Sequence, residues 1–96
     1  MTETASQNQP DSVEMSLSDA IVAARDLNEY VVSLDRILSR IGTGGQDPEI
    51  LVRYIVDRDV RTRLAEMRNV ICTALESRLG EERVDEICEE AYFYTD

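Results

Sequence analysis

The sequence predicts an all-α protein, in which two long helices form an antiparallel hairpin and a short third helix follows. Three observations carry this prediction. Apolar residues recur every three or four positions between residues 17 and 41, which is the repeat of a helix that packs along one narrow face. A glycine-rich stretch follows, and short loops of this kind join antiparallel helices. Asp47-Pro48-Glu49 then gives a strong signal for the start of a second helix.

The 96 residues leave room for one domain, which we place at residues 17–96. Residues 1–16 are polar, and the charged residues among them, Glu3, Asp11 and Glu14, are all acidic. Such a segment buries too little apolar surface to offset the entropy that is lost when it becomes ordered. We therefore expect a disordered acidic tail before the domain.

The first helix is expected over residues 18–41. Ser16 or Ser18 can cap its start, and Gly42 can end it, because glycine tolerates the left-handed conformation that follows many helices. The main apolar row, which we call the assembly seam, comprises Leu17, Ala20, Ala24, Leu27, Val31, Leu34, Leu38 and Ile41. A second apolar row along one flank consists of Ala23, Tyr30 and Ile37. We expect the second helix to pack on the seam, and two such hairpins to form a homodimer with a four-helix core.

The loop at residues 42–46 leads into a second helix over residues 48–79, which Gly80 ends. The periodicity shifts near residues 57–59, and Asp59 can cap a new helix there. Two alternatives stay open, namely one helix of about eight turns or a short helix followed by a long one.

Three arginines, Arg58, Arg61 and Arg68, lie in one row of the second helix. Two interpretations fit this row. It can pair with acids of the third helix or of a second subunit, which we favour because the complementary charge lies in the same chain. Alternatively, the row receives an acidic partner protein.

The third helix is expected over residues 81–92, and it leads into a trio of aromatic residues. The candidate partner-binding residues are this trio and the acids near it, namely Tyr92, Phe93, Tyr94, Glu86, Glu89 and Glu90. If the trio is exposed, it forms an apolar patch framed by acids, which suits the groove of a partner. We favour the alternative in which the trio folds onto the hairpin, because aromatic side chains are costly to leave in water.

The chain is strongly acidic, with 20 acidic residues against 10 basic ones and a net charge of −10. All ten bases are arginine, since the sequence contains neither lysine nor histidine. Nucleic-acid backbones and anionic membranes repel such a chain, so we expect no direct contact with either. The acidity is either a surface that meets a basic partner or imitates a polyanion, or an adaptation that maintains solubility at high salt. We favour adaptation.

The residues needed for catalysis are scarce, because the usual general base, histidine, is missing and so is lysine. Cys72 is expected to be a small core residue rather than a nucleophile, and no cofactor or metal motif occurs. We therefore expect a non-enzymatic regulator or adaptor that acts by contact with a protein partner. The alternatives are an acidic nucleic-acid mimic that inhibits a DNA- or RNA-binding protein, and a structural assembly subunit.

A cytoplasmic location is expected. The sequence contains no signal segment and no apolar run of membrane length. The two cysteines do not form a disulfide framework, although the sequence leaves the redox state of Cys72 and Cys88 open.

Overall fold

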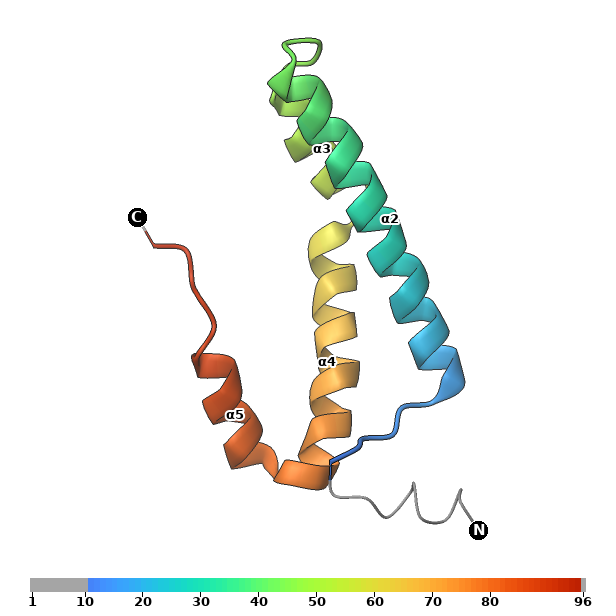
Figure 1. Cartoon of the computed structure of the whole chain (residues 1–96), viewed down its shortest axis with the longest axis vertical. Helices are drawn as coiled ribbons and strands as arrows, with labels where there is room; N and C mark the ends of the chain where they lie inside the picture. Colours follow the sequence, from blue (N-terminus) through green and yellow to red (C-terminus); the bar gives the residue numbers. More distant parts are fainter. Residues whose placement is uncertain (1–10, 96) are drawn as a thin grey trace. The chain divides into compact units, whose positions relative to one another are not determined.

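The computed structural model describes residues 11–95, and these residues form helices and no strand (Figure 1). The helices are α2 (Leu17–Gly42), α3 (Glu49–Asp57), α4 (Val60–Leu79) and α5 (Glu81–Glu89). The all-α prediction is confirmed. Most of the predicted disordered tail, residues 1–10, lies outside the described residues. Within the described part, every helix is too short or too polar to cross a membrane.

The chain forms two compact units, and the boundary between them falls within α4. The first, which we call the α2–α3 unit, comprises residues 16–68 and so includes the beginning of α4. The second, which we call the α4–α5 unit, comprises the described residues 11–15 and 69–95.

The start of α2 follows a local signal in the sequence. Ser16 is the N-cap, and its hydroxyl oxygen accepts a hydrogen bond from the backbone N–H of Asp19 at 3.1 Å. This bond satisfies one of the N–H groups that a helix start leaves without a partner. The Asp19 carboxylate also lies in the first turn, where the helix dipole favours an anion.

α2 ends at Gly42 as predicted, but Gly42 does not adopt the left-handed conformation expected there. Gly42 is the last helical residue, and the left-handed conformation occurs two residues later at Gly44, where φ is 81°. The loop folds back onto the helix end instead. The Gly45 N–H and the Thr43 hydroxyl both donate to the Arg40 carbonyl, at 2.9 Å and 3.1 Å. These bonds hold the loop against the last turn of α2.

The second helical segment is broken, which decides between the two alternatives left open by the sequence. α3 begins where the Asp47 side chain accepts a hydrogen bond from the Glu49 N–H at 2.9 Å. It ends at Asp57, Arg58 is its C-cap, and the next residue, Asp59, has a φ of 54°. A right-handed helix cannot pass through this left-handed residue, so α4 begins anew at Val60.

The third predicted helix is shorter than expected, because α5 ends at Glu89 rather than at residue 92. Gly80, with a φ of 87°, separates it from α4 as predicted. After Glu89 the N–H groups of Glu90 and Ala91 bond to carbonyls three residues earlier, which tightens the last turn. Ala91 is exposed, so no apolar contact continues the helix.

The core of the α2–α3 unit gathers side chains from all three of its helices. Its buried residues are Tyr30, Val60 and Met67, and the partly buried residues around them are Ala23, Leu34, Tyr54 and Ile55. In the α4–α5 unit, Ala74 and Val84 are buried, and Val84 is only 1% exposed.

The packing of α2 within the chain corrects the prediction that its seam faces the second helix. The helix buries its flank row instead, with Tyr30 in the core and Ala23 against it. Of the seam, Leu34 packs against the core, whereas Leu17 and Val31 are 76% and 67% exposed.

Ion pairs explain this rotation of α2. Asp26 and Glu29 lie beside Tyr30 on α2, and both pair with Arg63 of α4 at 2.8 Å. When these carboxylates face α4, Tyr30 points into the core and the seam turns aside. A heptad pattern indicates that a helix has an apolar face, but it does not tell which face the chain itself covers.

We expect substitutions at Asp59 to follow its left-handed conformation. Asp59→Gly should leave the free energy of unfolding unchanged or raise it, because glycine adopts this conformation without a steric penalty. Asp59→Val should lower it by about 1 kcal/mol or more. Denaturant unfolding followed by circular dichroism measures both changes.

The same pair of substitutions at Asp57, the last residue of α3, provides the control. There glycine should be the more harmful of the two, because Asp57 is helical. A larger loss for Asp59→Gly than for Asp59→Val would contradict the assigned break.

Candidate functional site

The most connected side chain of the α2–α3 unit is Glu29, and we call its group of partners the Glu29 cluster. Tyr54 donates its hydroxyl to Glu29 at 2.8 Å, and Arg58 donates Nε at 3.1 Å. Arg63 donates Nη2 to the second carboxylate oxygen at 2.8 Å and bonds Asp26 with the same nitrogen, also at 2.8 Å. One carboxylate therefore links α2 to α3, to the residue after α3, and to α4.

The charges of the Glu29 cluster reinforce one another. Hydrogen bonds from Arg58 above all, and then from Arg63 and Tyr54, hold the pKa of Glu29 well below its ordinary range. In turn, the hydrogen bond to Glu29 raises the pKa values of Arg58 and Arg63. A carboxylate that stays ionised and already accepts bonds from three side chains suits a structural role rather than proton transfer.

Tyr30 lies beside this cluster and contributes an unusual feature to the core. Its side chain is 5% exposed, and the Arg63 guanidinium stands over its ring at 5.0 Å from the centre. This distance is within the range of a cation–π interaction. The Tyr30 hydroxyl is buried and has no hydrogen-bond partner among the described residues. Burial raises the pKa of this hydroxyl.

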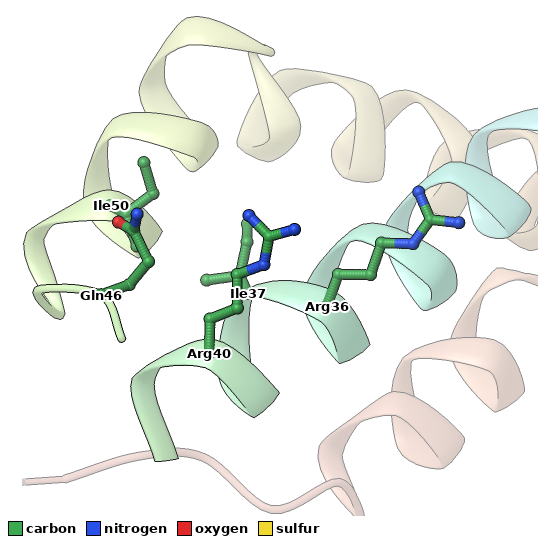
Figure 2. A pocket seen from close by; sticks show the side chains of 5 residues that line it. All are labelled: Arg36, Ile37, Arg40, Gln46 and Ile50. Atoms are coloured by element: carbon green, nitrogen blue, oxygen red, sulfur yellow. The ribbon is translucent and has the colours of Figure 1, made fainter. Parts of the chain in front are cut away.

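A second feature is a cavity of about 310 Å³ where the loop joins α2 to α3, which we call the basic notch (Figure 2). Its walls are Arg36, Ile37 and Arg40 of α2, Gln46 of the loop, and Ile50 of α3. Figure 2 shows both guanidinium groups rising on the same side of α2, with Gln46 and Ile50 across from Arg40. The notch combines two cations and an amide with two apolar side chains.

The two sides of the α2–α3 unit can be placed from the residues that face its core. Tyr30 of α2 and Ile55 of α3 both belong to the core. Glu29 and Tyr54 each precede one of them and bond to each other, so they share one side of the unit. Successive helical residues are about 100° apart, so the residue after a core residue lies on the side opposite the residue before it.

The residues that follow those core positions are Val31 and Val56, and they lie together on the side away from the Glu29 cluster. Both are well exposed, at 67% and 69%. Other exposed apolar residues of α2 and α3 extend this surface. We call it the apolar face, and it consists of Leu27, Val31, Leu38, Val52 and Val56.

The predicted arginine row is divided by the structure. Arg58 belongs to the Glu29 cluster and pairs with α2, not with acids of the third helix. Arg61 and Arg68 are exposed. The sequence analysis missed Arg63, which bonds two carboxylates, because these acidic partners lie 34 and 37 residues away.

The C-terminal candidates lie in the α4–α5 unit and are all exposed. The expected burial of the aromatic trio is wrong, because Tyr92, Phe93 and Tyr94 are between 62% and 86% exposed. Residues 92–95 belong to neither a helix nor a strand. Among the acids, Glu86 accepts a hydrogen bond from Arg83 at 3.3 Å, and Glu89 and Glu90 lie next to the trio.

Comparison with known proteins adds no family to these observations, since no protein-family model, curated protein or solved structure matches the chain. The described residues contain no group of three or more acidic or cysteine side chains arranged to hold a metal ion. The fold and surfaces thus define a small, acidic, all-α protein with an exposed apolar face, a basic notch and an exposed aromatic segment.

We expect the contribution of Glu29 to stability to depend on pH. Its pKa is lowered on folding, so the stabilisation is present above the pKa of the unfolded carboxyl, about 4.3, and is lost as the pH falls below that value. Glu29→Gln should therefore lower the thermal midpoint by several degrees at neutral pH. The difference between the two proteins should shrink steadily between about pH 5 and about pH 2.5.

Thermal unfolding at a series of pH values measures this difference, and Glu86→Gln is the matched control. Glu86 is exposed and bonds to Arg83 only three residues away, so its loss should hardly move the midpoint. A difference for Glu29→Gln that stayed constant down to the acid end would rule out the assigned pairing.

We expect Tyr30→Phe to raise the free energy of unfolding by about 1 kcal/mol, because it removes a buried hydroxyl that lacks a partner. The ring beside Arg63 is kept in this variant. The control, Tyr54→Phe, should have the opposite sign, because the Tyr54 hydroxyl donates to Glu29. Denaturant unfolding of both variants checks the prediction, which fails if Tyr30→Phe is the more destabilising one.

Proposed function

We propose that the protein is a non-enzymatic regulator or adaptor that acts through protein–protein contact and assembles as a homodimer. In this proposal α2 and α3 are the arms of a hairpin, and two hairpins pair through the assembly seam to make a four-helix core. The observation that carries the proposal is the exposure of seam residues such as Leu17, Val31 and Leu38, although α2 already packs within its own chain. An exposed apolar row with heptad spacing is typical of a helix that lacks a partner helix.

The small core supports association. Within residues 11–95, the buried apolar side chains are Tyr30, Val60, Met67, Ala74 and Val84. A core of this size contributes little against the entropy lost on ordering some eighty residues, and small domains often offset that cost by oligomerisation. A second copy that covers the apolar face would bury apolar side chains that are exposed in the single chain.

The symmetry of the seam favours a second copy of this chain as the partner. Its spacing reads the same in both directions about residue 29, so two antiparallel copies of α2 bring the same positions together twice. The pairs are Leu17 with Ile41, Ala20 with Leu38, Ala24 with Leu34, and Leu27 with Val31. Two of these pairs match a small side chain with a large one, which suits interdigitated packing about a two-fold axis.

α3 supports a four-helix arrangement rather than a simple pair of helices. Val52 and Val56 are exposed and lie on the same side of the unit as Val31. When two copies meet across α2, these valines are next to the interface and extend it. The apolar face then becomes the inner surface of a bundle.

The remaining surface supports a regulator or adaptor. The net charge of −10 disfavours nucleic acid and anionic membranes as ligands, and the partner that we propose is another protein. The exposed segment of Tyr92, Phe93 and Tyr94 is a compact recognition element for it. A cytoplasmic location is part of the proposal, because the exposed Cys88 lies outside any disulfide and is best preserved under reducing conditions.

We expect Val31→Glu to convert the dimer into a monomer. The substitution places a carboxylate at the centre of the proposed interface, where burial without a partner is costly. Sedimentation equilibrium over a range of concentrations should show a dimer for the wild type and at least about tenfold weaker association for the variant, a change of about 1.4 kcal/mol.

Val22→Glu is the matched control, because Val22 is also an exposed valine of α2 but does not belong to the seam. It adds the same charge and should leave the association constant nearly unchanged. A wild-type protein that is monomeric at every concentration would refute the dimer. Equal weakening by both variants would refute the seam.

A further inference from the structure

The basic notch contains cations that no carboxylate among residues 11–95 neutralises. Arg36 and Arg40 lie one turn apart on α2, and neither makes an ion pair within the described residues. In the same unit Arg58 and Arg63 are paired with Glu29, whereas Arg36 and Arg40 differ from the other arginines without an ion pair in that both line one pocket. No acidic side chain lines the notch. The cavity is therefore a positively charged site on a protein whose net charge is −10.

The loop side of the notch is held by hydrogen bonds, and the notch is partly apolar. Hydrogen bonds from Gly45 and Thr43 to the Arg40 carbonyl hold the loop in place, and the loop carries Gln46 into the wall. Ile37 and Ile50 are half-buried and supply apolar contact area. Its volume of about 310 Å³ lies near the lower end of ligand pockets and suits one large side chain. A fitting ligand carries negative charge next to an apolar group.

The chain itself contains a segment with this chemistry. Glu89 and Glu90 are exposed, and a single residue, Ala91, separates them from three exposed aromatic residues. Residues 89–95 thus carry two carboxylates, which matches the number of arginines in the notch, and rings that match its two isoleucines. Residues 92–95 form neither helix nor strand, so docking them breaks no backbone ladder.

We propose that the basic notch binds the acidic–aromatic segment, residues 89–95, of a second copy of this chain. Arg36 and Arg40 bond the carboxylates of Glu89 and Glu90, and an aromatic ring packs against Ile37 and Ile50. Guanidinium groups suit this task, because they bond carboxylates through two parallel N–H groups and also stack on aromatic rings.

This contact goes beyond the seam dimer and is independent of it. The notch is lined by residues of α2, the loop and α3, none of which belongs to the apolar face or the seam, and the segment lies in the other unit. The contact joins two different surfaces, so it is heterologous, whereas the seam pairs identical surfaces. Each copy then offers one notch and one segment in addition to its seam.

A peptide-binding experiment tests the proposal. The probe is a fluorescent peptide of residues 89–95 with both ends blocked. The receptor is the full chain carrying Tyr92→Ser, Phe93→Ser and Tyr94→Ser, so that no aromatic segment of its own competes. Fluorescence anisotropy should give saturable binding that weakens several-fold when salt rises from about 50 mM to about 300 mM. Adding Arg36→Gln and Arg40→Gln should weaken it about tenfold or more.

The matched control receptor carries Arg25→Gln and Arg53→Gln, which remove the same charge from exposed arginines of α2 and α3 outside the notch. Its affinity should stay within about twofold of the parent, and circular dichroism should show the same helix content in all receptors. A peptide with Glu89→Gln and Glu90→Gln should bind as weakly as the peptide binds the notch variant.

Three results would overturn the proposal. The first is no saturable binding to the parent receptor, and the second is equal loss in the notch and control receptors. The third is displacement of the peptide by inorganic phosphate at equal concentration, which would assign the notch to small anions. The assay reads the notch whether or not the seam forms dimers, so its failure is distinct from failure of the Val31→Glu experiment.

Discussion

The Glu29 carboxylate holds together segments whose own backbone does not fix their arrangement. α3 is only nine residues long, and α4 starts after a left-handed residue, so no continuous helix sets the direction between them. Arg58 and Arg63 stand on either side of this break, and both donate to the same carboxylate on α2. The angle between α3 and α4 at Asp59 is therefore determined by hydrogen bonds to Glu29 of α2. The burial of Val60 and Met67, which follow it, depends on this arrangement.

The same interaction decides which surface the protein presents. Because Glu29 and Tyr54 meet on one side of the α2–α3 unit, the residues one position after Tyr30 and Ile55 are turned to the other side. A polar cluster that stabilises the fold thus also exposes an apolar face. The packing of the core and the exposure of the apolar face both follow from the rotation of α2 about its axis. The burial of Tyr30 and the ion pairs of the neighbouring acids set this rotation.

The sequence predicted those features that arise from neighbouring residues. The cap at Ser16, the start at Asp47 and the stop at Gly80 each depend on a few residues, and all three occur in the structure. The sequence analysis did not predict the contacts between residues that are distant in the chain. Arg63 meets acids 34 and 37 residues away, and nothing near Arg63 in the sequence indicates them.

The candidate sites show the same limit. From the sequence, Arg40 could be interpreted only as a cation near the end of a helix. The notch forms only when the folded loop brings Gln46 and Ile50 beside Arg40, and the sequence does not show this. The seam was identified correctly as an apolar row, but its role within the chain was not. Periodicity counts apolar residues and does not weigh the ion pairs that rotate a helix. For the aromatic segment the sequence predicted burial, and the structure shows exposure. The cost of exposing aromatic rings favours burial in general, but it does not supply a surface on which these rings can pack.

The concentration of so many bonds on one side chain has a consequence for how this protein can change over evolutionary time. The apolar face tolerates exchange among leucine, isoleucine and valine, because volume and hydrophobicity are all that it requires. Glu29 has no equivalent replacement, because aspartate is one methylene shorter and glutamine lacks the charge. Its hydrogen-bond partners also come from three separate parts of the chain. Relatives of this protein should therefore exchange leucine, isoleucine and valine along the apolar face and be recognisable by an acid in α2 that is accompanied by a tyrosine and two arginines further along.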